Sequence, residues 1–230
     1  MNIAIIPARS GSKGLPDKNI KLLGNMPLLA HSVQSALKSR LFDEILVSTD
    51  SREYAEIAEH YGGSVPYLRE KLLSEDTTPM WDVVRDALYK YEASGQHFNT
   101  VTLLQPTSPL RTSVDIIKAH ELYTKNQADS VVSVCKADYS PHLCNMLPEN
   151  NSLNGFIKPE MISRQRQQLP EYYRINGAIY VIRCSYLAKS TDIYASRAYA
   201  YIMPRERSID IDDELDFILA EALYNRVVVQ

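Results

Sequence analysis

The sequence predicts an α/β fold in which a mostly parallel sheet carries helices on both faces. Two observations predict it. Short apolar segments alternate along the chain with longer amphipathic ones, a pattern typical of sheets whose parallel strands are joined by helices. The 230 residues, 45% hydrophobic and 23% charged, form an ordinary globular composition that suits one large domain or one domain with a substantial insertion.

The candidate strands are six short apolar runs: Asn2–Ile6, Glu44–Ser48, Thr100–Leu104, Ser130–Cys135, Ala178–Ile182 and Tyr199–Met203. Helical patterns lie between the early runs. After Pro79, apolar residues recur at i, i+3, i+4 and i+7 and form one helix face, namely Val84, Ala87, Leu88 and Tyr91. We expect Thr78 to cap this helix ahead of Pro79, and Gly95 to end it.

Two further helices are expected from the same period. The segment Thr112–Lys125 places Ile116, His120 and Tyr123 on one face. Near the C-terminus the apolar face is expected to consist of Leu215, Ile218, Leu219, Ala222 and Leu223.

The alternation breaks between Lys136 and Arg174. This stretch has four prolines, an Asn-rich turn and no long periodic segment, and it is too long for a passive loop in a compact domain. We expect a core formed by residues 1–135 and 175–230, and an insertion, residues 136–174, that packs on something else, such as a second subunit. A mobile lid is the alternative.

Composition and charge exclude several classes of protein. With 25 Lys and Arg against 28 Asp and Glu, the net charge of −3 does not fit a general nucleic-acid binder. No segment approaches the roughly 20 apolar residues of a membrane span, and the apolar N-terminal run is too short for a signal peptide. The three cysteines lie far apart without Cys-x-x-Cys spacing, which favours a reducing, cytoplasmic location.

A positively charged loop follows the first strand. Residues 7–19 read PARSGSKGLPDKN and hold two of the eight glycines, Gly11 and Gly14. In such a loop, backbone N–H groups can point at phosphate oxygens. Charge is supplied by Arg9, Lys13, Lys18 and Lys21. The loop is neither a Walker A motif nor a Gly-x-Gly-x-x-Gly motif. It predicts a nucleotide-phosphate site, with a solvated turn as the alternative.

Two acidic residues near the C-terminus predict a metal site. Side chains alternate along an extended Ile209–Asp212, so Asp210 and Asp212 share one face. Adjacent carboxylates repel unless a cation lies between them, and Mg²⁺ prefers such ligands together with phosphates and water. The alternative for Asp212 is the N-cap of the final helix. None of the five histidines has metal-ligand spacing with another.

Several motifs occur together in a fixed order. They are IIPARSGSKGLPDKN at 5–19, VSTD at 47–50, LLQPTSPLR at 103–111, RQQLP at 166–170, the stretch 174–180, and SIDID at 208–212. Through them, residues 2 to about 224 resemble the CMP-N-acylneuraminate (CMP-sialic acid) cytidylyltransferases. The related Kdo cytidylyltransferases share the fold but usually lack the Ser-Lys-Gly-Leu/Ile-Pro sequence of the first motif.

The resemblance implies a Rossmann-like nucleotidyltransferase fold. It also implies an enzyme that transfers CMP from CTP to the anomeric 2-hydroxyl of a nine-carbon 2-keto acid sugar and releases pyrophosphate. The expected cofactor is Mg²⁺. The expected partner is a second copy of the chain, because in this family the insertion forms the homodimer and the partner contributes to the sugar pocket.

Site residues are assigned by the same resemblance. Catalysis is expected from Arg9, Lys18 and the two metal ligands, Asp210 and Asp212. The residues expected to bind CTP are Ala8, Arg9, Ser10, Gly11, Ser12, Lys13, Lys18, Asn19, Arg69 and Thr78. Those expected to bind the sugar are Gln105, Arg166, Arg174 and Tyr180. An ion pair at a subunit interface is the alternative for Arg166 and Arg174.

Two positions depart from the family pattern. Arg69 would donate to O2 and N3 of cytosine, yet Glu70 stands where many relatives carry proline. Relatives selective for N-acetylneuraminate often have two adjacent aromatics near Ile193 and Tyr194. The isoleucine leaves legionaminate, or another 5,7-diacylamido nonulosonate, as an alternative substrate.

Two other functions fit these residues less well. A catalytically silent nucleotide-binding homologue would have no reason to keep Arg9, Lys18 and both aspartates together. A dinucleotide-dependent oxidoreductase does not fit, because the loop lacks the third glycine and contains Lys13.

Overall fold

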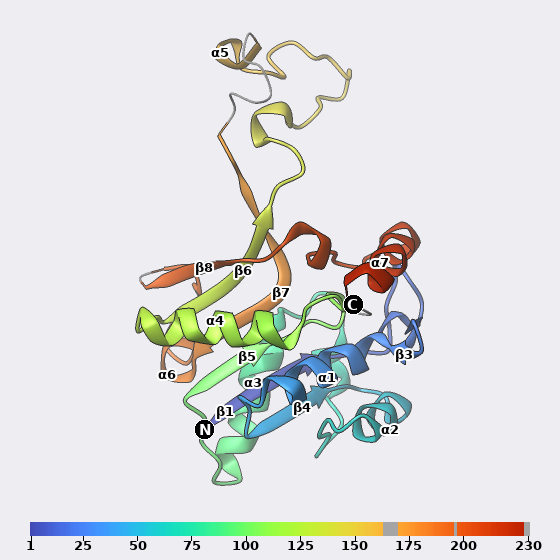
Figure 1. Ribbon diagram of the computed structural model, residues 1–230, viewed down its shortest axis with the longest axis vertical. Helices are drawn as coiled ribbons and strands as arrows, with labels where there is room; N and C mark the ends of the chain where they lie inside the picture. The colour runs from blue at the N-terminus through green and yellow to red at the C-terminus, as the bar shows by residue number, and fades with distance from the viewer. Residues whose placement is uncertain (163–169, 196, 228–230) are drawn as a thin grey trace.

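The computed structural model describes residues 1–162, 170–195 and 197–227. Its centre is a six-stranded sheet in the order β4-β1-β5-β7-β6-β8 (Figure 1). The strands are β1 (Asn2–Pro7), β4 (Glu44–Ser48), β5 (Thr100–Leu103), β6 (Ser130–Lys136), β7 (Tyr173–Arg183) and β8 (Ala198–Ile202). All six predicted strands therefore exist, with ends that differ by a few residues.

Most strand pairs are parallel. β1 pairs in parallel with β4 and β5, and β6 pairs in parallel with β8. Only β7, among the described strands of this sheet, runs antiparallel, between β5 and β6. The prediction of a mostly parallel sheet is confirmed. As a consequence, β7 enters the sheet at the edge where β1, β5 and β8 end, so the polar segments that follow these strands meet residues of β7.

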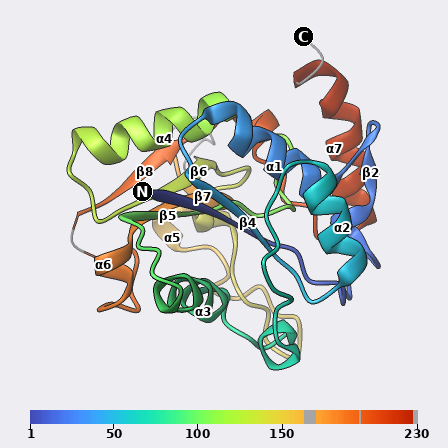
Figure 2. The ribbon, with the colours of Figure 1, turned by 90° about the horizontal axis from the view of Figure 1, so that it is seen from below.

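Helices cover both faces of the sheet, as predicted (Figure 2). α1 (Leu28–Ser39), α2 (Arg52–His60) and α4 (Ser113–Lys125) contribute to the hydrophobic core of one face. α3 (Met80–Ala93) and α6 (Cys184–Leu187) contribute to the core of the other. β1 lies between the two cores, and Ile3, Ile5 and Ile6 are fully buried, which explains its uninterrupted apolar run.

The remaining elements are short or lie at the rim. A small hairpin, β2 (Leu22–Leu23) and β3 (Met26–Pro27), packs near the terminal helix α7 (Glu214–Val227). The short helical segments are η1 (Lys18–Ile20), η2 (Lys71–Ser74), η3 (Pro141–Leu143), α5 (Pro159–Ile162) and η5 (Arg205–Arg207).

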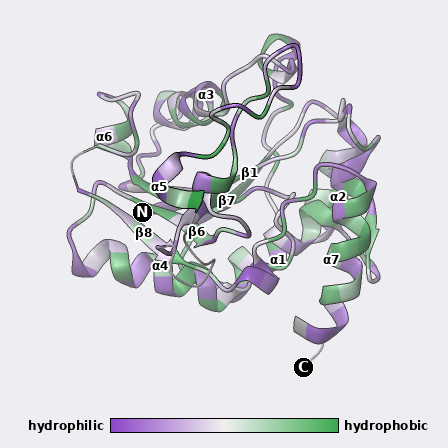
Figure 3. Cartoon of the chain, turned by 90° about the horizontal axis from the view of Figure 1, so that it is seen from above, coloured by the Kyte–Doolittle hydropathy of each residue, from purple (hydrophilic) through white to green (hydrophobic). Residues whose placement is uncertain are grey.

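Two details of the helix predictions are wrong. The N-cap of α3 is Pro79, and Thr78 instead donates its hydroxyl to the carbonyl of Leu72, because the turn before the helix folds back on η2. α7 forms, but Leu215 on its predicted apolar face is 74% exposed and Phe217 is buried instead. Hydrophobic residues lie all along this helix (Figure 3), so periodicity alone does not select the face that packs.

The segment between β6 and β7 stands away from the body of the protein (Figure 1). None of its described residues, 136–162 and 170–174, is buried. It carries exposed apolar side chains instead, among them Met146 at 89% and Ile162 at 72% exposure. Such side chains on a projecting arm are typical of a surface that another molecule covers.

Candidate active site

A cleft of about 460 Å³ opens at the edge of the sheet where β1 and β5 end. Its described lining residues are Pro7, Arg9, Ser12, Lys13, Gly14, Lys18, Asn19, Arg69, Met80, Gln105, Pro106, Thr107, Asp210 and Asp212. The fold thus brings the basic loop, the predicted base reader, one predicted sugar contact and the acidic pair into one space. This position is where α/β sheets usually bind their ligands. No lining residue comes from the described part of the 136–174 segment.

Hydrogen bonds inside the protein hold the basic loop in shape. The backbone N–H and the hydroxyl of Ser10 both donate to the carboxylate of Asp50, at 2.9 and 3.1 Å. The buried amide of Asn19 donates to the carbonyl of Arg9 at 2.9 Å. Ser10 therefore braces the loop without lining the cleft, and Asn19 both braces and lines it.

The two glycines of the loop differ. A Cβ added at Gly14 would lie 2.6 Å from the carbonyl oxygen of Asp212, so a side chain here would push the acidic segment away. A Cβ at Gly11 would meet nothing within 4 Å. Ala8, fully buried, donates its N–H to the carbonyl of Ser48 and does not line the cleft. The close backbone approach is thus at Gly14, toward the acidic segment.

Each cation of the loop has an acidic partner. Arg9 lies 2.5 Å from a carboxylate oxygen of Asp76, and Lys13 contacts the other oxygen of the same group. These hydrogen bonds, first from Lys13 and then from Arg9, lower the pKa of Asp76. Lys18 donates to the carbonyl of residue 211 at 2.6 Å and to Asp212 at 3.2 Å. The basic loop is thus joined to the acidic segment by Lys18.

Arg69 is buried at the cleft with an unused donor. Its Nε donates to the hydroxyl of Ser74, whereas one terminal guanidinium nitrogen is buried without a hydrogen-bond partner. Burial lowers the pKa of this guanidinium. A buried donor without an acceptor is costly, so an acceptor from a ligand would stabilise it. Thr78, in contrast, is half-buried and does not line the cleft.

Glu70 does not disturb the backbone beside Arg69. Its φ of −62° and ψ of 146° are values that proline also adopts. Its carboxylate lies 3.5 Å from Lys90, on α3. The departure from the family pattern is therefore conformationally neutral at this position.

The acidic pair offers oxygen atoms to a cation. Oδ1 of Asp210 is buried and has no hydrogen-bond partner. Burial raises the pKa of Asp210, and the charge of Asp212 raises it further. A cation would remove both penalties. Within the described residues no group of three or more His, Cys, Asp or Glu side chains is placed to hold a metal ion, so the two carboxylates stand without a third protein ligand of these types.

The cap of α7 is Asp213, and the alternative assignment of Asp212 is wrong. The N–H of Asp216 donates to the carboxylate of Asp213 at 3.0 Å. Asp216 in return accepts from the N–H groups of Asp212 and Asp213. The helix begins one residue later than the sequence suggested, which leaves the carboxylate of Asp212 free of capping and in contact with Lys18.

Gln105 and Asp210 meet over one glycine. Gly177 has φ +74°, and a Cβ there would lie 2.5 Å from Oε1 of Gln105 and 3.3 Å from Oδ2 of Asp210. The pairing register between β6 and β7 shifts at this point, between Val132 and Val134. Sequence reasoning did not single out Gly177. An isolated glycine inside a strand pattern is the signal that could have found it.

A buried arginine fixes the loop that carries Gln105. Arg111 donates to the carbonyls of Gln105 and Ala178, at 3.2 and 2.8 Å, and to the hydroxyl of Ser32 at 2.5 Å. Complete burial lowers the pKa of Arg111 to about 9. This side chain therefore ties the end of β5 to β7 and to α1.

Of the other residues predicted to bind the sugar, Tyr180 and Arg174 are described by the structure and Arg166 is not. Tyr180 packs edge-on against Trp81, with ring centroids 5.6 Å apart, and burial raises its pKa to about 12. Arg174 donates to the carbonyl of Ser208 at 3.2 Å. Neither lines the cleft. Arg166 lies outside the described residues.

Histidines and cysteines take no part in the cleft. None of the five histidines lines it, and His31 and His120 are buried and hydrogen-bonded inside the core. The three cysteines are free. Within the described ranges, every helix is too short or not apolar enough to cross a bilayer.

Comparisons with known proteins agree with this site. Residues 3–230 match the family described as Cytidylyltransferase. A CMP-N,N′-diacetyllegionaminic acid synthase of Legionella pneumophila is 38% identical over 228 residues, covering 96% of this chain and 95% of that protein. An N-acylneuraminate cytidylyltransferase of Escherichia coli is 38% identical over 219 residues, covering 95% of this chain and 51% of that protein.

The solved structures show the same fold. CMP:2-keto-3-deoxy-manno-octonic acid synthetase complexed with CTP superposes with a TM-score of 0.72 at 14% identity, covering 98% of each chain. At this identity the likeness bears on the fold alone. The family match over nearly the whole sequence, together with relatives well above 30% identity, decides the classification: this chain belongs to the cytidylyltransferase family.

Proposed function

We propose that this protein transfers CMP from CTP to the anomeric 2-hydroxyl of a nonulosonic acid and releases pyrophosphate. The observation that carries the proposal is the composition of one cleft. Its walls hold three cations, a buried guanidinium with an unused donor, and a buried carboxylate oxygen without a partner. A triphosphate, a cytosine ring and a divalent cation complement these three features.

The nucleotide is held at both ends. Arg69 donates to O2 and N3 of cytosine, which are both acceptors. Arg9, Lys13 and Lys18 bind the phosphates and neutralise the charge of the departing pyrophosphate. Transfer at a phosphorus atom needs positioning and charge neutralisation more than covalent help, and these contacts contribute to both.

Asp210 and Asp212 would hold Mg²⁺. The unpartnered Oδ1 of Asp210 fits a cation, and two carboxylates leave further ligand positions for phosphate oxygens and water. When bound, the metal supplies charge neutralisation at the phosphates and lowers the pKa of an oxygen ligand. Lys18, in contact with both the acidic segment and the basic loop, sets the distance between metal and phosphate sites.

The acceptor is a nine-carbon sugar acid, with N-acylneuraminate as the first candidate. Gln105 would bond a hydroxyl or the acyl amide, while Arg166 and Arg174 would pair with the sugar carboxylate. A second candidate is N,N′-diacetyllegionaminate. Two observations favour it: Ile193 stands in place of an aromatic residue, and the similarity to the Legionella synthase covers 96% of this chain and 95% of that protein. Ile193 is itself buried in the core, so any effect on the sugar is indirect.

We further propose that residues 136–174 form the contact of a homodimer and contribute to the partner's sugar pocket. The exposed apolar side chains of this projecting arm support the proposal. The free cysteines support a reducing compartment, the cytoplasm. A light-scattering mass of one chain at micromolar concentration would contradict the dimer.

The function is tested by measuring pyrophosphate release from CTP with a panel of sugar acids. The panel contains N-acetylneuraminate, N,N′-diacetyllegionaminate and an eight-carbon 2-keto-3-deoxy-octonate. We expect turnover with at least one nine-carbon acid and little with the octonate. The Asp210→Ala variant is expected to lose roughly three orders of magnitude in kcat, because charge stabilisation at the reacting phosphate is lost. No turnover with any nine-carbon acid would contradict the proposal.

A further inference from the structure

The acidic pair, Asp210 and Asp212, lies on a segment that belongs to no β-strand or α-helix. Residues 203–213 connect β8 to α7 and contain only the short turn η5. Ligands of a cation must keep their geometry within a fraction of an ångström, so such a segment needs support from its surroundings. The support begins three residues before Asp210, at Arg207.

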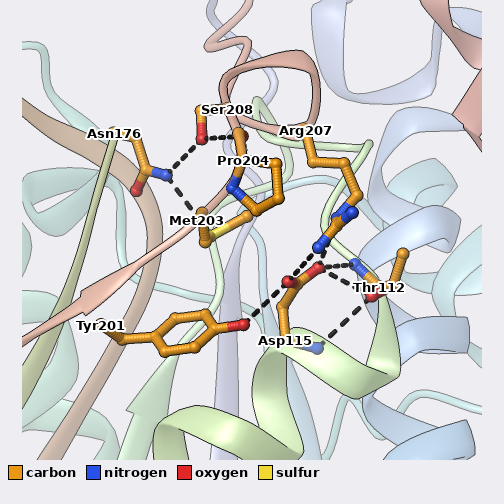
Figure 4. Close-up of polar contacts among 8 residues, drawn as sticks. All are labelled: Thr112, Asp115, Asn176, Tyr201, Met203, Pro204, Arg207 and Ser208. Atoms are coloured by element: carbon orange, nitrogen blue, oxygen red, sulfur yellow. Dashed lines mark hydrogen bonds and ion pairs between the residues drawn. The ribbon is translucent and has the colours of Figure 1, made fainter. Parts of the chain in front are cut away.

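Arg207 is held by a fully buried carboxylate on α4. Asp115 accepts from Nε and one terminal nitrogen of Arg207, at 3.0 and 2.8 Å (Figure 4). The hydroxyl of Tyr201 donates to the same carboxylate at 3.0 Å. The two-point contact fixes the direction of the guanidinium as well as its distance.

Asp115 does more than complete the capping box at the start of α4. It forms a capping box with Thr112, whose hydroxyl and N–H donate to it at 2.7 and 3.0 Å. A cap needs no burial, yet this side chain has no exposed surface. Burial alone would raise its pKa; the hydrogen bonds from Arg207 and Thr112 outweigh that and lower it. The group is thus a buried anion that joins the start of α4 to the segment of the acidic pair.

A second brace holds the next residue. Ser208 is fully buried, and its hydroxyl accepts from the amide of Asn176 at 2.9 Å and donates to the carbonyl of Pro204 at 2.7 Å (Figure 4). Its carbonyl accepts from Arg174. Asn176 precedes Gly177, the residue over which Asp210 packs. Positions 207 and 208 are therefore tied to α4 and β7 just before the chain reaches the cleft.

We infer that Asp115 is a positioning residue for the acidic pair, acting through Arg207, and that this role goes beyond stabilising the fold. The inference rests on the proposed cation-binding role of Asp210 and Asp212. If Asp115 is replaced, Arg207 loses its two-point anchor. The segment is then held before Asp210 by Ser208 and after it by the hydrogen bond from the N–H of Ile211 to the carbonyl of Thr107, and Asp210 keeps its position less precisely.

A matched control exists at the other end of the same strand. Arg197 precedes β8, as Arg207 follows it, and donates through Nε and a terminal nitrogen to Asp129, at 3.2 and 3.1 Å. Asp129 is also buried, and it forms an ion pair with a second arginine, Arg183, at 3.4 Å. Asp129→Asn therefore weakens a similar pair of a buried aspartate and a partly exposed arginine without touching the segment of the acidic pair.

The experiment compares Asp115→Asn with Asp129→Asn. Both are expected to lower the melting temperature. Only Asp115→Asn is expected to weaken Mn²⁺ binding and to lower kcat, each by about 10-fold, while KM for CTP stays nearly unchanged. Mn²⁺ binding is measured by electron paramagnetic resonance with the metal alone. Equal effects of the two variants on Mn²⁺ binding and kcat would overturn the inference, because they would reflect stability alone.

A milder variant covers the case in which Asp115→Asn does not fold. Arg207→Lys keeps the charge but not the two-point contact, and we expect it to weaken Mn²⁺ binding by a smaller factor than the tenfold above. Wild-type Mn²⁺ affinity in this variant would overturn the inference. The metal titration needs no turnover. If the wild type binds Mn²⁺ but no sugar acid is a substrate, the proposed reaction fails while the inference about Asp115 is still tested.

Discussion

The two walls of the cleft are built differently. On the basic wall, Arg9 and Lys13 reach Asp76 through partly exposed ion pairs, and the side chain of Lys13 is 83% exposed. On the acidic wall, the segment of Asp210 is tied to the core through Asp115, which has no exposed surface. One wall is anchored at the surface and the other in the interior.

This difference suits the two tasks proposed for the site. Exposed ion pairs contribute little to stability and exchange partners readily, so phosphate oxygens can replace Asp76. Buried hydrogen-bonded networks lock their members in one arrangement. The basic wall is therefore adaptable, as the proposed binding of a flexible triphosphate requires, whereas the acidic wall is rigid, as the proposed binding of a cation requires. Variants of Gly177, Arg69 and Asp76 test this comparison.

Gly177→Ala tests how tightly the acidic wall is packed. The added Cβ would lie 2.5 Å from Gln105 and 3.3 Å from Asp210, at φ +74°. We expect kcat/KM to fall by roughly 100-fold, because a displacement of about 1 Å at a reacting centre costs that much. Gly95→Ala is the control in the same assay, because Gly95 follows α3, also has a positive φ (+86°), and a Cβ there meets nothing within 4 Å. Similar activity of the two variants would contradict a preorganised acidic wall.

Arg69→Ala tests the buried donor that lines the cleft. A charge-assisted hydrogen bond is worth about 1.5–3 kcal/mol, so we expect the preference for CTP over UTP to fall by about 10- to 100-fold. The ratio of the two kcat/KM values measures it. Arg85→Ala removes an arginine that contacts Asp82 and the carbonyl of Ser190, away from the cleft. An unchanged base preference in Arg69→Ala would remove Arg69 from base recognition.

Asp76→Asn tests the adaptability of the basic wall and has the smallest expected effect. The carboxylate of Asp76 pairs with Arg9 and Lys13, the cations proposed to bind the triphosphate, so its neutralisation should lower KM for CTP by about threefold. Inhibition by pyrophosphate should strengthen similarly. Glu75→Gln, which makes the same change of charge one residue earlier, is the control. A higher KM in Asp76→Asn would mean that Asp76 positions Arg9 and Lys13 for the phosphates.

Much of the fold followed from local pattern. The six strands, the helices at 80–93 and 113–125 and the basic loop after β1 were all recognisable, because period and turn chemistry act over a few residues. α1 was not recognised, since its buried face includes polar residues such as His31, Ser32 and Ser35. These side chains find hydrogen-bond partners inside the protein, and sequence periodicity does not show such partners.

The residues of the candidate site also differ in whether local sequence pattern reveals them. Arg9, Lys13, Lys18, Gln105, Asp210 and Asp212 were named from motifs and do line one cleft. The supporting groups were not named, because their partners are distant in the chain: Asp115 and Arg207 are separated by 92 positions, and Gly177 acts through Gln105 and Asp210.

Residue type and spacing thus specified an alternating α/β chain, a basic loop after the first strand and a pair of acids near the end, because these are properties of neighbouring residues. Packing between distant elements specified the rest. It selected the buried face of α7, gave the helix cap to Asp213, and placed Gly177 beneath Gln105 and Asp210. It also tied the acidic wall to a buried carboxylate on α4, a contact that exists only when β8 and α4 lie side by side.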